Sequence, residues 1–353
     1  MSKVVVGMSG GVDSSVTAYL LKKAGYEVIG ATVKILHTQF GEEGKCCETD
    51  DARTVCDMLD IPYYVINGVA DFKENVINPF ICSYIKGKTP NPCIECNRYI
   101  KWAKMLEFAN DIGAEYVATG HYAHVVKLDN GRFTVKKADY AQKDQTYMLY
   151  RLTQEQLSRT LMPLGKLTKQ EARDIAESIG LPVAHKADSQ EICFVPDDDY
   201  AGYIEENYEG EPLPEGNFVD TKGNVLGTHK GIIHYTIGQR KGLGIAVGHP
   251  IFVKEIRPET NEVVLSDEEE IFNDTVICNR VNFQSIEDLK PGETLRCKAK
   301  VRYHHVPEDA ILERMDEKRI KITFDKPVRA AAPGQSAVFY DDNDCVIGGG
   351  IIE

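Results

Sequence analysis

The stretch that decides the fold runs Lys3-Val4-Val5-Val6-Gly7-Met8-Ser9-Gly10-Gly11-Val12-Asp13-Ser14. Its β-branched first half predicts a buried parallel strand, and residues 13–23 predict the helix that follows. The two glycines allow a tight turn and let an anion approach the backbone amides closely. Asp13 and Ser14 are helix-capping residue types and lie where the helix begins, so free N–H groups and the positive end of the helix dipole converge there. We therefore predict a phosphate-binding turn.

This turn differs from two familiar phosphate-binding loops. A dinucleotide-binding fingerprint needs three glycines at set spacings, and a Walker A loop needs a lysine before its Ser or Thr. The chain has no lysine between Lys3 and Lys22. Residues 9–14 instead resemble the SGGxDS pyrophosphatase loop of ATP-dependent adenylating enzymes, which holds the pyrophosphate that leaves. The alternative is an ordinary glycine-rich turn capped by Asp and Ser.

The composition describes a protein of two or three domains. The chain has 353 residues, and single hydrophobic cores stop growing near ~250–300 residues. No run approaches the ~20 apolar residues of a membrane helix, and a strand that begins at Lys3 leaves no room for a signal peptide. Ten cysteines in a chain without export signals favour reduced thiols that serve chemistry or metal binding over structural disulfides. We expect a cytoplasmic protein with no membrane association.

Strands and helices alternate through the first half of the chain. The pattern predicts three further strands, at 27–33, 63–66 and 115–121. It predicts helices at 50–59, 100–110 and 168–179, the last with Thr168 as its N-cap. Such alternation indicates an α/β fold with a doubly wound parallel sheet, whose ligands bind at the carboxyl ends of the strands.

The second half of the chain is predicted to consist of short β-strands. Residues 196–215 are acidic and rich in Gly and Pro, which is typical of a domain boundary. Beyond them, short apolar runs separated by Gly, Pro, Asn and Asp predict a small β-rich central domain and a C-terminal β-barrel. We therefore predict domains at 1–200, 201–270 and 271–353.

Charge is distributed unevenly along this acidic chain, whose formal net charge is −13. The tracts 221–254 and 294–307 contain no Asp or Glu. In the second tract four cations alternate with apolar residues, which predicts a basic face on one strand: Arg296, Lys298, Lys300 and Arg302. The basic, glycine-rich loop 238–244 suits contact with a phosphate backbone. Both tracts indicate a polyanionic partner, although a solvated strand face would have the same pattern.

Cys93 and Cys96 form a CxxC where a helix is predicted to begin, after the extended segment Thr89-Pro90-Asn91-Pro92. A thiol near a helix N-terminus and beside Arg98 is expected to have a lowered pKa and to be a competent nucleophile. The alternative is half of a zinc site, for which the adjacent pair Cys46-Cys47 would have to supply further ligands.

Cys193 is the third cysteine that stands in an informative context. It follows the polar stretch 186–191 and precedes the acidic residues of the boundary. Considered alone, this cysteine is equally typical of a small buried apolar residue.

Taken together, these segments resemble the family of tRNA-specific 2-thiouridylases, which replace the 2-oxygen of the wobble uridine with sulfur. The resemblance covers almost the whole chain and rests on motifs in order: SGGVDS at 9–14, TPNPxxxCN at 89–97, ATGHYA at 118–123, KDQTY at 143–147, DSxxxCF at 188–194, IHYTIGQRKGLG at 233–244, VRY at 301–303 and PGQSAVFY at 333–340. The first motif alone would leave argininosuccinate, GMP, asparagine and lysidine synthetases open.

The resemblance implies a role for particular residues. It implies that Cys96 is the nucleophile, that Cys193 carries a persulfide, and that Asp13 takes part in catalysis. It implies ATP with Mg²⁺, bound by Gly7, Met8, Ser9, Gly10, Gly11, Val12, Asp13, Ser14, Val33 and Gly120. It implies contacts with the target base or the tRNA from Asn91, Pro92, Cys93, His121, Lys143, Asp144, Gln145, Arg302, Tyr303 and Gln335.

The resemblance also implies a reaction and its partners. AMP is transferred to the uridine 2-oxygen, and sulfur from the Cys193 persulfide replaces it, which leaves a Cys96–Cys193 disulfide for a reductant. The partners are tRNAs with a wobble uridine, those for Lys, Glu and Gln, and a persulfide-donating relay protein or cysteine desulfurase.

Three alternatives stay open. Many members of the family have Asp where this chain has Cys93, so Cys93, Cys96 and Cys193 could instead ligate a [4Fe–4S] cluster. The second alternative is an ATP-dependent synthetase that acts on a small metabolite. The third is a tRNA-binding module without enzymatic activity.

Overall fold

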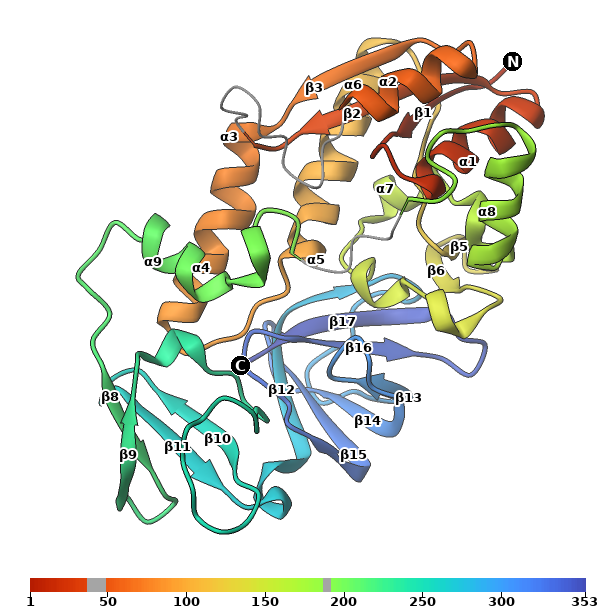
Figure 1. The fold of residues 1–353 in the computed structure, drawn as a ribbon. Helices are drawn as coiled ribbons and strands as arrows, with labels where there is room; N and C mark the ends of the chain where they lie inside the picture. Colours follow the sequence, from red (N-terminus) through yellow and green to blue (C-terminus); the bar gives the residue numbers. More distant parts are fainter. Residues whose placement is uncertain (37–48, 187–191) are drawn as a thin grey trace.

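The computed structural model describes residues 1–36, 49–186 and 192–353 of the chain. Figure 1 shows an α/β unit, with a four-stranded sheet and a closed barrel side by side at its lower edge. The prediction of a doubly wound parallel sheet followed by a β-rich unit and a barrel is therefore confirmed.

The first unit is a five-stranded parallel sheet in the order β3-β2-β1-β4-β7. Its strands and the hairpin β5–β6 have the bounds β1 (Lys3–Gly7), β2 (Glu27–Lys34), β3 (Tyr63–Asn67), β4 (Tyr116–Ala118), β5 (Ala123–Lys127), β6 (Phe133–Lys137) and β7 (Thr160–Leu161). Its helices are α1 (Val12–Lys23), α2 (Thr49–Met58), α3 (Val69–Phe72), α4 (Asn78–Ile85), α5 (Pro92–Cys96), α6 (Ala103–Asp111), α7 (Gln154–Ser158), α8 (Lys169–Ser178) and α9 (Tyr200–Asn207). π-Helical stretches η1 (Lys73–Ile77) and η2 (Asn97–Trp102) join α3 to α4 and α5 to α6.

The remaining strands form the other two units. The four-stranded sheet has the order β10-β11-β8-β9 and the barrel the order β12-β15-β14-β13-β16-β17. Their bounds are β8 (Gly216–Val219), β9 (Val225–His229), β10 (Phe252–Arg257), β11 (Glu262–Ser266), β12 (Phe272–Phe283), β13 (Thr294–Lys300), β14 (Glu308–Arg314), β15 (Ile320–Arg329), β16 (Ser336–Tyr340) and β17 (Val346–Ile352). Short 3₁₀ turns are η3 (Ala141–Lys143), η4 (Thr146–Met148), η5 (Pro163–Lys166), η6 (Pro196–Asp198), η7 (Ile232–His234) and η8 (Glu268–Ile271).

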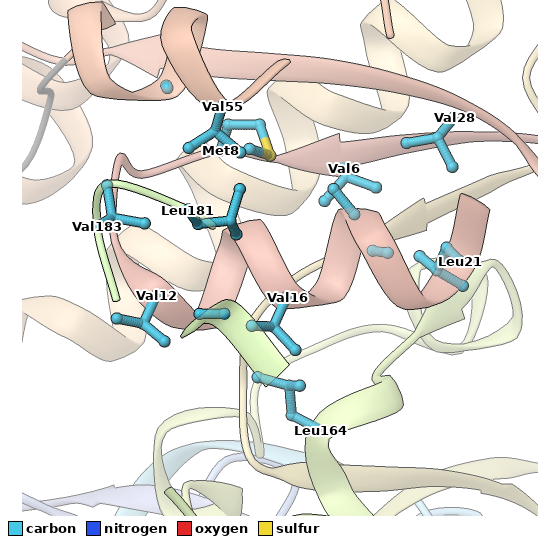
Figure 2. Close-up of a cluster of buried hydrophobic side chains, with 14 of the residues drawn as sticks. Val6, Met8, Val12, Val16, Leu21, Val28, Val55, Leu164, Leu181 and Val183 are labelled. Carbon is cyan, nitrogen blue, oxygen red and sulfur yellow. The ribbon is translucent and has the colours of Figure 1, made fainter. Parts of the chain in front are cut away.

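Strand β1 is buried on both faces, as its β-branched sequence predicts. Val4 and Val6 lie in the cluster formed with α1, α2 and α8, whereas Val5 lies in the cluster formed with α6. Figure 2 shows Val12 and Val16 of α1 in the first of these clusters. This packing holds the N-terminus of α1 at the carboxyl end of β1, where the glycine-rich loop lies.

Three local predictions need correction. The helix predicted at 100–110 begins earlier, at Pro92, so Cys93 and Cys96 both lie inside it. The strand predicted at 115–121 ends at Ala118, because Gly120 leaves the sheet to pack on the first turn of α1. Helix α9 lies within the acidic stretch 196–215 and buries Ala201 and Ile204.

The predicted N-cap at Thr168 is confirmed, and it fixes the start of α8. The Thr168 hydroxyl accepts a hydrogen bond from the Glu171 amide at 3.1 Å, and the Glu171 carboxylate accepts one from the Thr168 amide at 2.7 Å. This reciprocal capping box makes Lys169 the first residue of the helix.

The barrel is joined to the α/β unit by buried tyrosines and by one glutamine. The Tyr147 hydroxyl donates to the Ser336 carbonyl at 2.8 Å, and Tyr150 shares a 3.0 Å hydrogen bond with the Ser336 hydroxyl. The Gln335 side chain donates to the Thr89 carbonyl at 2.9 Å, and the Thr89 amide donates to the Pro333 carbonyl at 2.8 Å. The barrel therefore holds the segment that leads into α5.

Candidate active site

The glycine-rich loop begins α1 without a side-chain cap. Gly11 is the N-cap residue, and no side chain accepts a hydrogen bond there. The prediction that Asp13 and Ser14 cap the helix is therefore wrong, because both lie inside its first turn. Ser14 Oγ instead donates to the Gly11 carbonyl at 3.1 Å and accepts from the Ser9 amide at 3.2 Å. A helix start without a side-chain acceptor leaves its N–H groups available to an anion.

Asp13 is held by two residues from distant parts of the chain. Lys169 Nζ lies 2.8 Å from both carboxylate oxygens of Asp13, and the Tyr122 hydroxyl donates to Oδ1 at 2.8 Å. The sequence analysis did not identify Lys169 or Tyr122 as site residues. A signal for Lys169 was available, because the predicted N-cap at Thr168 places it at a helix N-terminus.

Gly120 lies against the same turn of α1. A Cβ atom at this position would lie 2.8 Å from the backbone carbon of Asp13 and 2.8 Å from the Ser14 nitrogen. Only glycine allows this close approach of backbone to backbone. Gly7 is similarly close-packed, since a Cβ atom there would lie 2.9 Å from Met105 Sδ.

Lys186 brings a second distant cation to the loop. Its Nζ donates to the Gly10 carbonyl at 3.3 Å and to Asp51 Oδ2 at 2.8 Å. Burial lowers the pKa of this lysine. The Lys186 carbonyl in turn accepts from Arg173 at 3.1 Å. The cationic charge that the loop sequence lacks therefore comes from Lys169 and Lys186, and only the fold reveals this.

Cys93 and Cys96 occupy different environments on α5. The Asn91 side chain caps the helix by accepting from the Cys93 amide at 3.2 Å, and Pro92 takes the first helical position. Cys93 lies in the first turn and is exposed, whereas Cys96 is only 6% exposed. The thiol nearer the helix N-terminus is thus that of Cys93.

Cys96 and Cys193 belong to one apolar cluster. Cys96 is a buried member of this cluster, and Cys193 and Val33 are partly buried and pack against it. Phe194 is a buried member of the same cluster, and its ring centroid lies 5.5 Å from that of Phe72 on α3 and 5.3 Å from that of Phe80 on α4. The structure therefore brings the two predicted sulfur residues and Val33, a predicted ATP contact, to one region.

The predicted tRNA contacts at 143–145 make extensive contacts within the protein. Asp144 is buried and its carboxylate accepts from the Thr146 hydroxyl at 2.8 Å. The Gln145 side chain accepts from the Tyr122 amide at 2.9 Å. The Tyr303 hydroxyl donates to the Asp144 carbonyl at 3.1 Å. Lys143 is partly exposed and lies in the same segment.

The predicted basic strand is only partly correct. Its alternation holds, since Cys297 and Ala299 are buried. However, Arg296 pairs with Asp325 and Lys298 pairs with Asp342. Lys300 is buried and lies between the rings of Tyr147 and Tyr303, and Arg302, beyond the strand, donates to the Ile237 carbonyl at 2.6 Å. The four cations therefore do not form a continuous basic face.

His121 follows β4 and lies beside Trp102. Its Nδ1 shares a 2.8 Å hydrogen bond with the Thr119 hydroxyl, and its ring centroid lies 5.4 Å from that of Trp102. Burial, and then the charge of Lys101, lower its pKa to about 3. The imidazole is therefore neutral at physiological pH.

This depressed pKa predicts a result that NMR can check. The His121 ring resonances are expected to show no titration between pH 5 and 8 in the folded protein, and to titrate near the usual value of about 6.5 in urea. Because only the unfolded chain takes up this proton, the residue's contribution to stability is present above about pH 6.5 and is lost as the pH falls toward 3. A titration near neutral pH in the folded protein would contradict this neutral state of the ring.

Within residues 1–36, 49–186 and 192–353, no three His, Cys, Asp or Glu side chains are grouped so that they could hold a metal ion. Cys46 and Cys47, which the zinc alternative requires, lie outside the described residues, as do residues 187–191 of the Cys193 segment. In the same described ranges, no helix is long and apolar enough to cross a membrane.

The sheet is doubly wound and parallel, and the glycine-rich loop after β1 leads into a helix that has no side-chain cap. This arrangement defines a nucleotide-binding protein of the adenine-nucleotide alpha-hydrolase-like type. Family models agree with this class and extend it to the rest of the chain. They match as a tRNA methyl transferase HUP domain at residues 2–197, a tRNA methyl transferase PRC-barrel domain at 203–267 and an aminomethyltransferase beta-barrel domain at 274–352.

Full-length relatives give the particular family. The chain is 56% identical over 359 residues to the tRNA-specific 2-thiouridylase MnmA of Lachnoclostridium phytofermentans, with 100% of this chain and 99% of the relative covered. It is 53% identical over 359 residues to the protein of the same name from Acetivibrio thermocellus, with 99% of each covered. The chain belongs to the tRNA-specific 2-thiouridylase family.

Proposed function

We propose that the protein is a tRNA-uridine 2-sulfurtransferase, which adenylates the 2-oxygen of a wobble uridine and replaces it with sulfur. The observation that carries this proposal is the apolar cluster that holds Cys96 and is contacted by Cys193 and Val33. Two cysteines and a candidate ATP contact in one region suit a reaction that joins nucleotide activation to sulfur transfer. The full-length match to 2-thiouridylases supports the same substrate.

The loop residues 7–14 would hold ATP by its phosphates. The uncapped N-terminus of α1 offers N–H groups, and Gly10 adopts a φ of +68°, a left-handed conformation that favours glycine. Mg²⁺ supplies further positive charge when it accompanies ATP. Lys169 contacts the loop at Asp13 and Lys186 contacts it at Gly10, and both would stabilise the negative charge of the departing pyrophosphate.

The activation step makes the uridine oxygen a leaving group. The 2-oxygen attacks the α-phosphorus of ATP and pyrophosphate departs. The carbon–oxygen bond can then break with release of AMP. Asn91, Pro92 and Cys93 would border the base, since they form the N-cap and the start of α5, one turn before Cys96, and Cys93 is exposed there. A base in an anticodon loop can reach such a position because it leaves its stack at low cost.

The sulfur step uses both cysteines. The outer sulfur of a Cys193 persulfide attacks C2 of the activated uridine and displaces AMP, so that Cys193 Sγ is linked through this sulfur to C2. The Cys96 thiolate then attacks Cys193 Sγ, and the sulfur–sulfur bond to the substrate sulfur breaks. The products are 2-thiouridine and a Cys96–Cys193 disulfide, which an external dithiol reduces by exchange.

We also propose how the units divide the work. Residues 1–200 would carry ATP, both cysteines and the tRNA contacts at His121 and 143–145. The central domain 201–270 would join this unit to the barrel, and the barrel 271–353 would contact the tRNA through Arg302, Tyr303 and Gln335. A persulfide-donating relay protein or cysteine desulfurase would load Cys193, which is partly exposed. The buried position of Cys96 and the exposed position of Cys93 favour the persulfide route over a [4Fe–4S] cluster on Cys93, Cys96 and Cys193.

Reconstitution tests the proposal. The purified full-length chain, with ATP, Mg²⁺, a persulfide donor and an unmodified tRNA transcript, is expected to form 2-thiouridine at the wobble position, detected by mass spectrometry of the digested RNA. A transcript with cytidine at that position is the control. Absence of thiolation in a protein that binds ATP and tRNA would contradict the proposal. If thiolation requires a bound [4Fe–4S] cluster and needs no persulfide donor, the cluster route replaces the persulfide route proposed for the sulfur step.

A further inference from the structure

We propose that Tyr122 is a positioning residue that couples the phosphate loop to the segment 144–146, so that nucleotide and tRNA bind cooperatively. The inference rests on the proposed function, because it concerns how the two substrates of that reaction influence each other. It is carried by one residue, whose buried side chain bonds Asp13 and whose backbone bonds Gln145. No other contact described above joins Asp13 to this segment so directly.

The first half of the connection is the bond to the loop. The Tyr122 side chain is only 2% exposed and belongs to the cluster that packs on α1. Its hydroxyl donates to Asp13 Oδ1 at 2.8 Å, on the carboxylate that Lys169 also holds. A phenylalanine would satisfy the apolar packing, so the hydroxyl has the specific task of orienting Asp13.

The second half is formed by the backbone of the same residue. The Tyr122 amide donates to Gln145 Oε1 at 2.9 Å, and the Tyr122 carbonyl accepts from the Gln145 amide at 3.0 Å. This pair of hydrogen bonds fixes Tyr122 and Gln145 to each other. A displacement of Gln145 therefore moves the backbone of Tyr122, and with it the donor that orients Asp13.

The segment 144–146 is in turn fixed to the barrel. The Tyr303 hydroxyl donates to the Asp144 carbonyl at 3.1 Å, and the Thr146 hydroxyl shares a 3.3 Å hydrogen bond with that of Tyr340. Lys300 lies over the rings of Tyr303 and Tyr340. RNA that contacts Gln145 or Tyr303 thus acts on a network of hydrogen bonds that ends at the phosphate loop. Binding of RNA at one end and of the nucleotide at the other therefore favours the same arrangement of Tyr122.

The test measures this cooperativity in the full-length protein. The dissociation constant of an unmodified tRNA transcript is determined with and without α,β-methylene ATP and Mg²⁺. The wild-type protein is expected to bind the tRNA about tenfold more tightly with the analogue, within the range of about 5- to 150-fold typical of coupled sites. In Tyr122→Phe this factor is expected to fall below about twofold, because the ring is kept and only the hydroxyl that reaches Asp13 is lost.

The control is Tyr150→Phe, which removes the hydroxyl of an equally buried tyrosine that bonds Ser336 Oγ at 3.0 Å. This variant is expected to keep the wild-type factor. An unchanged factor in Tyr122→Phe, an equal loss in Tyr150→Phe, or a wild-type protein without cooperativity would each overturn the inference. A wild-type protein that binds both substrates but forms no 2-thiouridine would instead contradict the proposed function.

Discussion

Substitution of Cys96 or Cys193 by alanine is expected to reduce tRNA thiolation by at least about 10³-fold, because each sulfur forms or breaks a covalent bond in the proposed reaction. Release of pyrophosphate in the presence of tRNA is expected to persist, since adenylation needs neither thiol. The two measurements, 2-thiouridine by mass spectrometry and pyrophosphate by a coupled assay, therefore separate activation from sulfur transfer.

The two cysteine variants are also expected to differ from each other. After incubation with the persulfide donor, Cys96→Ala is expected to retain one extra sulfur atom on Cys193, because the thiol that would attack this persulfide is missing. Cys193→Ala is expected to retain none on Cys96. Cys82→Ala, which changes an exposed free thiol on α4, is the matched control with unchanged turnover. Persistent thiolation in either active-site variant would contradict the assignment.

The second large effect is expected at Asp13. In Asp13→Asn the carboxylate that accepts from Tyr122 and pairs with Lys169 loses its charge. Lys169 is then left without this partner, and the geometry of the first turn of α1 changes. Adenylation, measured as tRNA-dependent pyrophosphate release, is expected to fall by about 10²- to 10³-fold, the usual cost of removing one precisely placed electrostatic group from an active site.

Asp57→Asn provides the comparison for this variant. Asp57 lies on α2, is exposed, and has no contact with the loop described above. Its substitution is expected to leave pyrophosphate release within about twofold of the wild type, as for most surface changes. Equal rates in Asp13→Asn and wild type would show that the carboxylate has no part in the reaction.

The sequence predicted those features that depend on local patterns. The run at 3–8 predicts a buried strand because β-branched residues on both faces are typical of a parallel strand that is covered on both sides. Val4 and Val5 do lie in different clusters. Thr168 was identified as an N-cap from its position before an amphipathic run. The cysteines and the loop were identified from motifs that lie in short, contiguous segments.

The errors have local physical causes. The sequence pattern places Asn91 and Pro92 at the end of an extended segment. The same residue types also suit the N-cap and the first position of a helix, and α5 begins there. The basic strand has the predicted alternation, but the sequence could not show that Tyr147 and Tyr303 would cover Lys300. Asp13 and Ser14 are common capping residues, but the turn at Gly11 places them one step inside α1.

The residues that were missed make long-range contacts. Lys169 and Lys186 reach the loop from parts of the chain far from it, and Tyr122 reaches Asp13 from beyond β4. Periodicity and composition carry no information on which distant side chains will meet. The contact of Tyr122 follows from the order of the strands, since β4 lies next to β1 in the sheet and its carboxyl end adjoins the loop.

The hydrogen bonds between the barrel and Thr89 have a consequence for which base of a bound nucleic acid would react. Gln335 and Pro333 bind the backbone at Thr89, a few residues before the helix that carries Cys93 and Cys96. These hydrogen bonds fix one edge of the barrel to the segment that leads into that helix. A nucleic acid bound to the barrel would bring to Cys96 only a nucleotide at a certain distance along the strand. The base that reacts would therefore be selected by this distance as well as by its identity.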